Sequence, residues 1–128
     1  MPRAPRVLFA DDNQGMHRMV HTVLDSSFEV SDAFDGQEML DRIPAFRPDL
    51  LLVDIHMPVL GGLDAVRRLS RFDRPAILFL TADLDAELLV RMREAGAQGC
   101  VLKANAGEDL IPAIHAALSG EHCFPPDR

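Results

Sequence analysis

Near the middle of the chain stands Leu50-Leu51-Leu52-Val53, an unbroken apolar run that ends at the carboxylate of Asp54. A strand covered on both faces of a sheet has this composition, whereas a half-exposed strand alternates between apolar and polar residues. Two similar runs, at residues 7–10 and 76–80, also end at polar residues. We therefore expect three buried strands, each followed by a polar side chain.

Two shorter segments complete the set of strands. Phe28-Glu29-Val30-Ser31 alternates between apolar and polar residues, as a strand at the edge of a sheet does. Cys100-Val101-Leu102 is apolar throughout and ends at Lys103. The sequence thus predicts five strands, with the second one at an edge.

Helical segments separate the strands. Between residues 16 and 24, apolar residues recur every three or four positions, which is the spacing of one helix face. The next helix opens with a capping-box pair, Asp35 and Glu38, and is expected to be closed by Pro44 and Pro48.

Three more helices follow later in the chain. The first begins after Gly61-Gly62, and the second is expected to be capped by Asp83 and to end at Gly96. The last should begin near residues 107–109, because Pro112 has no amide hydrogen and fits only near a helix start. Five strands that alternate with five helices predict one α/β domain, a doubly wound parallel sheet with helices on both faces.

Length and composition limit the class of protein. The 128 residues, 48% hydrophobic and 26% charged, suffice for one folded domain. No apolar run approaches the ~20 residues of a membrane span. A net charge of −7 disfavours direct binding of nucleic acid, and two cysteines without a disulfide framework favour a reduced, cytoplasmic location. We expect an N-terminal extension at residues 1–5, the domain at 6–120, and a tail or the start of a linker at 121–128.

Polar residues follow four of the five predicted strands: Asp11 and Asp12, Asp54, Thr81, and Lys103. Each could serve only its own loop, as a helix cap, a turn residue or a solvated charge. In an open parallel sheet, however, ligands bind beyond the carboxyl ends of the strands, where these five side chains would meet. We therefore expect one functional site.

The chemistry follows from this set of groups. Three crowded carboxylates repel one another and favour a shared cation, and Mg²⁺ prefers such hard oxygen ligands. An ammonium and a hydroxyl nearby can hold the oxygens of a phosphoryl group. One of the carboxylates can then act as a nucleophile and become an aspartyl phosphate.

The stretch Asp54-Ile55-His56-Met57-Pro58, with Gly62 eight residues after Asp54, resembles the phosphoacceptor loop of bacterial two-component response-regulator receiver domains, the CheY-like superfamily. Members of that family also carry the acidic pair, the Thr and the Lys at these strand ends. The resemblance implies a flavodoxin-like (βα)5 fold with strand order 2-1-3-4-5. It also implies a signalling domain that catalyses only its own phosphorylation and dephosphorylation.

The resemblance assigns a role to each residue of the set. Asp54 accepts a phosphoryl group from the phosphohistidine of a histidine kinase or phosphotransfer protein, Lys103 contacts that group, and Thr81 moves toward it. The implied ligands of Mg²⁺ are Asp11, Asp12, Asp54 and the backbone carbonyl of His56. Phosphorylation then switches a partner or an attached output domain.

Two positions depart from the common pattern of the family. Cys100 stands where many receivers have a switching aromatic residue, so we expect the helix at 83–95 to shift instead of one ring flipping. Ala104 replaces the common Pro after Lys103. This variation is similar to receivers attached to LuxR-type DNA-binding domains, which implies a role in transcription regulation.

The resemblance also implies a binding face for a partner or for a second copy of the chain. Three segments build this face: the helix at 83–95, the strand at 100–102 and the helix at 107–118. On the first of these helices, Leu89 and Val90 are expected to lie outside an inward stripe formed by Leu84, Leu88 and Met92. Exposed apolar side chains of this kind would suit a partner site.

Two further groups are interpreted as ordinary surface. His17 and His21, four residues apart on a helix, could bind a metal, but no third ligand is evident nearby in the sequence. A basic run is interpreted as a solvated helix face, and it comprises Arg67, Arg68, Arg71 and Arg74.

Three alternatives stand beside the receiver interpretation. A phosphohydrolase of the haloacid-dehalogenase type would need a second Asp where His56 stands. A flavin-binding module would need a phosphate-binding loop and aromatic stacking partners, and the chain has no Trp or Tyr. A receiver-like interaction module would act without phosphorylation, but the acidic pair and Lys103 argue against it.

Overall fold

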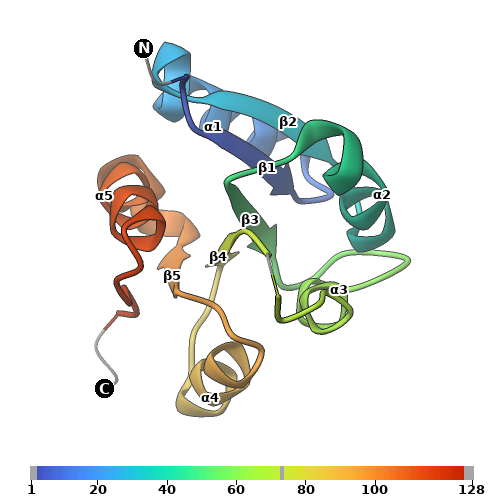
Figure 1. The fold of residues 1–128 in the computed structure, drawn as a ribbon. Helices are drawn as coiled ribbons and strands as arrows, with labels where there is room; N and C mark the ends of the chain where they lie inside the picture. The colour runs from blue at the N-terminus through green and yellow to red at the C-terminus, as the bar shows by residue number, and fades with distance from the viewer. Residues whose placement is uncertain (1–2, 73, 126–128) are drawn as a thin grey trace.

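Five parallel strands form one sheet in the order β2-β1-β3-β4-β5, and helices connect and cover them (Figure 1). The computed structural model describes residues 3–72 and 74–125. The strands are β1 (Arg6–Ala10), β2 (Glu29–Ala33), β3 (Leu50–Asp54), β4 (Ala76–Thr81) and β5 (Gly99–Leu102). The helices are α1 (Gln14–Leu24), α2 (Gly36–Phe46), α3 (Gly62–Arg67), α4 (Ala86–Glu94) and α5 (Ala106–Leu118), with short 3-10 turns at Asp25–Ser27 and Lys103–Asn105. The predicted alternation and strand order are both confirmed.

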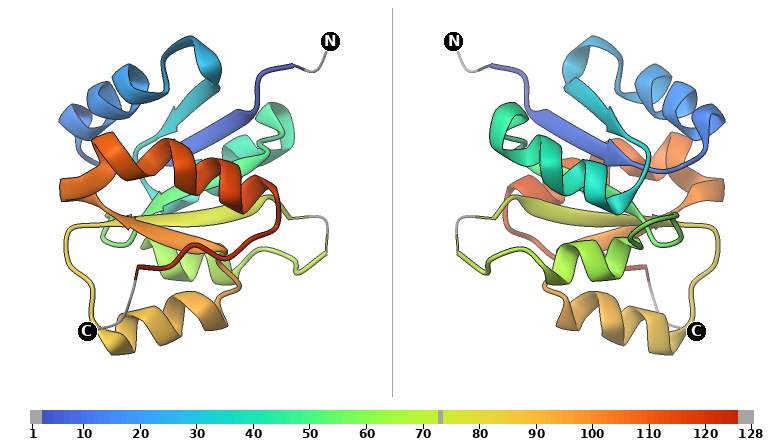
Figure 2. Two further views of the ribbon diagram at one scale, coloured as in Figure 1. Left: turned by 90° about the vertical axis from the view of Figure 1, so that its left-hand side faces the viewer. Right: turned by 90° about the vertical axis from the view of Figure 1, so that its right-hand side faces the viewer.

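Helices cover both faces of the sheet (Figure 2). α1 and α5 lie on one face, and α2, α3 and α4 lie on the other. On β3, Leu51 and Val53 pack with the second group of helices, whereas Leu50 and Leu52 pack with the first. Because both faces of β3 are buried, its sequence is a continuous apolar run. No helix within the described ranges is long and apolar enough to cross a membrane.

The two edges of the sheet differ. β2 forms one edge, as its alternating sequence predicts, and it pairs in parallel with β1. At the other edge, Cys123 forms a parallel bridge to Gly99 of β5, and its amide donates to the carbonyl of Gln98 at 2.9 Å. The described part of the predicted tail therefore packs against the domain.

The start of α4 differs from the prediction. Asp85 caps this helix, because its carboxylate accepts a hydrogen bond from the amide of Leu88 at 2.7 Å, and Asp83 lies outside it. The predicted inward stripe of Leu84, Leu88 and Met92 does pack against the core. Leu89 is only 6% exposed, so the expectation that it lies outside is wrong, whereas Val90 is 54% exposed as expected.

Two helices contain a proline. The expectation that Pro44 closes α2 is wrong, whereas Pro112 lies near the start of α5 as predicted, and the helix begins one residue earlier than the predicted range. α2 continues through Pro44 to Phe46. α5 begins at Ala106, directly after a 3-10 turn, so Pro112 lies in its second turn. Both Pro112 and Glu108, whose carbonyl loses its helical donor, are exposed. Water can satisfy such a carbonyl, which lowers the cost of a proline within a helix.

Candidate functional site

A cluster of charged side chains lies at the carboxyl ends of β1, β3 and β5. Asp11, Asp12 and Asp54 each place a carboxylate oxygen within 4.8 Å of the other two. Lys103 Nζ lies 3.1 Å from Asp11 Oδ2 and 3.3 Å from Asp54 Oδ1. The structure thus brings together these four residues, which we call the acidic site.

The register of the sheet explains why the carboxylates meet. β1 and β3 are neighbours, and Ala10 pairs with Val53. Asp11 directly follows β1 and Asp54 is the last residue of β3, so their side chains emerge at the same edge. Lys103 follows β5, which lies two strands from β3, and its long side chain reaches the carboxylates past the end of β4.

Burial and charge set the acid–base behaviour of the acidic site. Burial, followed by the nearby charge of Asp11, raises the pKa of Asp54, while Lys103 acts in the opposite direction. Burial acts to lower the pKa of Lys103, but attraction to Asp11 and Asp54 raises it overall. The lysine therefore stays protonated and offsets part of the repulsion between the two buried carboxylates.

The two carboxylate oxygens of Asp11 have different surroundings. The amide of Asn13 donates to its Oδ1 at 2.9 Å. Its Oδ2 is buried and makes no well-oriented hydrogen bond with any described residue, although the charge of Lys103 lies close. A buried carboxylate oxygen without a hydrogen bond is costly. Together with the exposed Asp12, this oxygen suits a hard divalent cation such as Mg²⁺.

Thr81 and His56 lie beside the acidic site. Thr81 is buried at the end of β4, and its hydroxyl donates to the backbone carbonyl of Asp83 at 2.9 Å. In this arrangement the hydroxyl is hydrogen-bonded to the loop before α4. His56 is an exposed residue of the loop after β3. The roles assigned to both residues stay predictions.

The loop between β3 and α3 packs closely on the end of the strand. The amide of Gly62 donates to the carbonyl of Ile55 at 3.0 Å, and a Cβ at Gly62 would collide with the backbone carbonyl of Asp54. Val59 has a φ of 69°, a left-handed conformation that β-branched residues rarely adopt. The need for space explains a glycine eight residues after Asp54.

Cys100 is buried on β5 among apolar side chains. Burial raises the pKa of its thiol to about 11, so the group stays neutral and packs as a small hydrophobic residue. Its predicted part in switching is not tested by these contacts.

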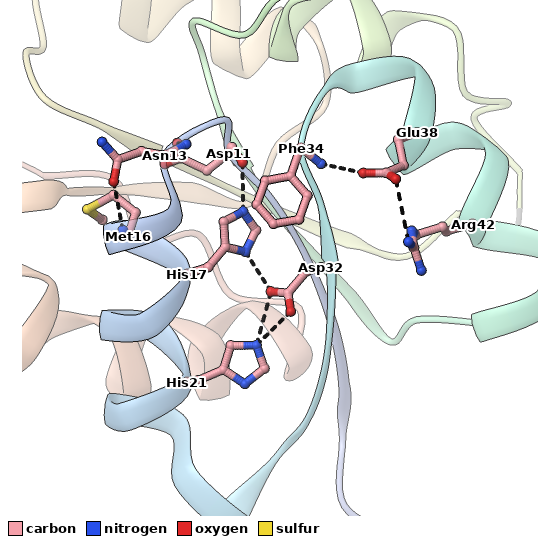
Figure 3. A network of polar contacts seen from close by, with 9 residues as sticks. All are labelled: Asp11, Asn13, Met16, His17, His21, Asp32, Phe34, Glu38 and Arg42. Atoms are coloured by element: carbon pink, nitrogen blue, oxygen red, sulfur yellow. Dashed lines mark hydrogen bonds and ion pairs between the residues drawn. The ribbon is translucent and has the colours of Figure 1, made fainter.

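The prediction that His17 is a solvated surface residue is wrong. Figure 3 shows its ring between Asp11 and Asp32, and its exposed fraction is only 5%. Nδ1 lies 2.5 Å from Asp32 Oδ1, and Nε2 lies 2.6 Å from the backbone oxygen of Asp11. His21 is exposed as expected, yet its Nε2 also lies 2.9 Å from Asp32 Oδ2. The spacing of His17 to Val20 and Leu24, the other buried residues of α1, could have indicated its burial. The contact with Asp32 could not be predicted from local sequence, because Asp32 comes from another element, β2.

The basic run is also more than a solvated helix face. Arg71 and Arg74 follow α3 and donate to the backbone carbonyls of Glu94 at 2.6 Å and Ala95 at 2.5 Å. Carbonyls at a helix C-terminus lack partners within the helix and carry partial negative charge. These two arginines therefore cap α4, whereas Arg67 and Arg68 are exposed as predicted.

Comparison with known proteins agrees with this geometry. Residues 7–115 match the model of the response regulator receiver domain family. The chain is 34% identical over 113 residues to hybrid signal transduction histidine kinase D of Dictyostelium discoideum, an alignment that covers 86% of this chain and 7% of the kinase. It is 36% identical over 117 residues to the transcriptional regulatory protein PdtaR of Mycobacterium tuberculosis, covering 89% of this chain and 57% of PdtaR. The chain therefore spans well under two thirds of these two relatives.

Other relatives are matched along nearly their whole length. The chemotaxis protein CheY of Halobacterium salinarum is 30% identical over 118 residues, which cover 91% of this chain and 98% of CheY. Among solved structures, a LuxR-family two-component response regulator from Aurantimonas sp. superposes with a TM-score of 0.87 at 25% identity, covering 96% of this chain and 90% of that one. CheY4 of Vibrio cholerae gives 0.83 at 29% identity, with 90% and 99% covered. With the family model matching most of its length and the acidic site in place, the chain belongs to the response regulator receiver domains of two-component signalling systems.

Proposed function

We propose that Asp54 accepts a phosphoryl group from the phosphohistidine of a histidine kinase or phosphotransfer protein in a Mg²⁺-dependent reaction. The observation that carries this proposal is the position of Asp54, a buried carboxylate at the end of the central strand, 3.3 Å from Lys103 and beside Asp11. The ammonium of Lys103, and Mg²⁺ once it is bound, would stabilise the negative charge of a phosphoryl group at this carboxylate.

The proposed transfer of the phosphoryl group to Asp54 forms one bond and breaks another. An oxygen of Asp54 attacks the phosphorus, the new O–P bond forms, and the N–P bond of the phosphohistidine breaks. The imidazole leaves with the electron pair and takes a proton from solvent. Lys103 supplies positive charge to the phosphoryl oxygens as they move onto Asp54. The product is an aspartyl phosphate.

The acidic site also suits the cofactor. Asp11, Asp12, Asp54 and the backbone carbonyl of His56 would hold Mg²⁺, because three carboxylates lie within 4.8 Å of one another and the charge of Lys103 offsets only one of theirs. A bound Mg²⁺ supplies positive charge that offsets the repulsion between the carboxylates and an incoming phosphoryl group.

The proposed effect of phosphorylation on a partner depends on the hydrogen bond that Thr81 makes with the loop before α4. Phosphorylation would draw the Thr81 hydroxyl from the Asp83 carbonyl toward the new phosphoryl oxygens and so change the loop that leads into α4. The face formed by α4, β5 and α5 would then bind a partner, an attached output domain or a second copy. Since the chain is similar to transcriptional regulators and to a LuxR-family regulator, a DNA-binding output is part of this proposal. A histidine kinase as donor would place these events in the cytoplasm.

The test is intact-protein mass after incubation with acetyl phosphate and Mg²⁺. Wild type should gain one phosphoryl mass, Asp54→Asn should gain none, and a matched control, Asp41→Asn on the exposed face of α2, should behave as wild type. A phosphoryl gain by Asp54→Asn at the wild-type rate would contradict the assignment. No gain by wild type with acetyl phosphate or with a phosphorylated kinase would favour an interaction module that acts without phosphorylation.

A further inference from the structure

The buried His17 is not needed for the proposed phosphotransfer chemistry, yet it touches the backbone of the acidic site. Its Nε2 lies 2.6 Å from the backbone oxygen of Asp11 (Figure 3). That oxygen belongs to the peptide that joins Asp11 to Asp12. A contact that holds this peptide plane therefore restricts ψ of Asp11 and φ of Asp12, the two dihedral angles that orient these side chains relative to it.

The contact defines which ring nitrogen carries a proton. A carbonyl oxygen can only accept a hydrogen bond, so Nε2 of His17 must donate. The opposite nitrogen, Nδ1, lies 2.5 Å from Asp32 Oδ1, and that contact also needs a proton, on the ring or on the carboxyl. Both ring nitrogens are satisfied, as a buried imidazole requires.

The ring itself has little freedom to move. Its centroid lies 4.5 Å from that of Phe9 on β1 and 4.3 Å from that of Phe34, which directly follows β2. Asp32, which holds Nδ1, is also on β2. The imidazole on α1 is thus held by contacts with β1 and with residues on and directly after β2. These contacts restrict the direction in which Nε2 donates.

Most polar atoms of Asp11 form hydrogen bonds. Its amide donates to the carbonyl of Ala33 at 3.1 Å, its carbonyl accepts from His17, and its Oδ1 accepts from the amide of Asn13. Only Oδ2 is left without a well-oriented hydrogen bond. That oxygen lies 3.1 Å from Lys103 Nζ, within the cluster that Asp11 forms with Asp12 and Asp54.

We propose that His17 is a positioning residue, which orients the Asp11–Asp12 peptide so that both carboxylates converge on a divalent cation. This inference rests on the proposed function for its cation, but the hydrogen bond itself exists without one. Partners that orient metal ligands in this way typically change metal affinity by about tenfold or more when they are removed.

The experiment compares two substitutions of nearly equal shape. His17→Gln keeps an N–H donor on an unbranched side chain, whereas His17→Met has similar length and no donor. Titration of Mg²⁺ into ¹⁵N-labelled protein should show binding about tenfold weaker for His17→Met, with affinity recovered at least in part by His17→Gln. His21→Ala is the matched control, because His21 contacts the same Asp32 but has no contact with Asp11 among the described hydrogen bonds, and it should bind Mg²⁺ as wild type does.

A second measurement needs no metal, and its first part needs no variant. In metal-free wild type, ring ¹⁵N spectra should show the proton of His17 on Nε2. In metal-free His17→Met, the amide resonance of Asp12, which lies in the peptide that His17 holds, should shift more than in His21→Ala. An unprotonated Nε2, or equal Mg²⁺ affinity in His17→Met and wild type, would overturn the inference. Failure of wild type to bind Mg²⁺ at all would instead overturn the proposed function, while the metal-free spectra would still test His17.

Discussion

Lys103 Nζ lies 3.3 Å from Asp54 Oδ1, although the two residues belong to strands separated by β4. The lysine is the only one in the chain. Among the described residues, its ammonium is the single cation that forms ion pairs with both buried carboxylates, Asp11 and Asp54.

Lys103→Met should slow phosphorylation by acetyl phosphate about 10²-fold, because a positioned charge that stabilises the transition state is lost. Arg18→Met, which removes an exposed positive charge from α1, is the matched control and should react at the wild-type rate. Intact mass over time gives both rates. Equal rates for Lys103→Met and wild type would show that the ion pair serves folding and not transfer.

Asp54→Asn should raise the melting temperature at pH 7. The pKa of Asp54 is raised in the folded protein, so the folded state binds more protons there than the unfolded state does. Its contribution to the free energy of unfolding therefore falls as pH rises from the ordinary carboxyl range through the raised pKa. The increase in melting temperature caused by Asp54→Asn should therefore become smaller as the pH is lowered toward 4. A gain that does not depend on pH would contradict this explanation.

Asp12→Ala should abolish the chemical-shift changes that Mg²⁺ causes around the acidic site, because it removes the exposed ligand of the three carboxylates. Asp41→Ala removes an equal charge from α2 and should leave the titration unchanged. Removal of Mg²⁺ from wild type should raise the pKa of Asp54 further, since the repulsion from Asp11 is then less compensated. Unaltered shifts in Asp12→Ala would place the ion elsewhere.

Gly62→Ala should lower the free energy of unfolding by about 1–3 kcal/mol, because its Cβ would collide with the carbonyl of Asp54 and the loop would have to move. Gly107→Ala is the matched control. Nothing lies within 4 Å of a Cβ there, and the residue is helical, so alanine should stabilise by roughly 0.5–1 kcal/mol. Chemical denaturation measures both changes, and equal stability of Gly62→Ala and wild type would contradict the close packing.

Beryllofluoride, a mimic of the phosphoryl group, should change amide hydrogen exchange across residues 83–105 as well as around Asp54. Thr81 donates to the carbonyl of Asp83, so moving its hydroxyl releases the loop before α4. Thr81→Val lacks that hydroxyl and should confine the changes to the loops around Asp54. Changes that never reach residues 83–105 in wild type would exclude this face as the switch.

Local sequence was sufficient for the strands and for the polar residues at their ends. A strand buried on both faces must be apolar throughout, so residues 50–53 are recognisable without any knowledge of their neighbours. The residue that stops such a run must lie at the edge of the sheet. Asp54, Asp11 and Lys103 could for this reason be assigned to one site from their positions along the chain, and the structure brings them together.

Helix limits were less certain from sequence, because more than one local signal can cap a helix. Asp83 and Asp85 are both suitable caps, and Asp85 is the one that caps α4 in the structure. Leu89 is buried and Val90 is not, because the packing of α4 against the core decides how wide a face of the helix is covered. A cap is a local interaction, but the point where the chain leaves the sheet is a tertiary property.

The partners of His17 were decided by tertiary structure alone. On α1 it lies three residues before Val20 and seven before Leu24, so it shares the buried face of the helix although its side chain is polar. It is buried because β2 brings Asp32 to one ring nitrogen and the end of β1 brings the carbonyl of Asp11 to the other. Helical periodicity describes which residues share a face, but it carries no information about polar partners that arrive from other strands, and those partners determine whether a polar side chain can be buried.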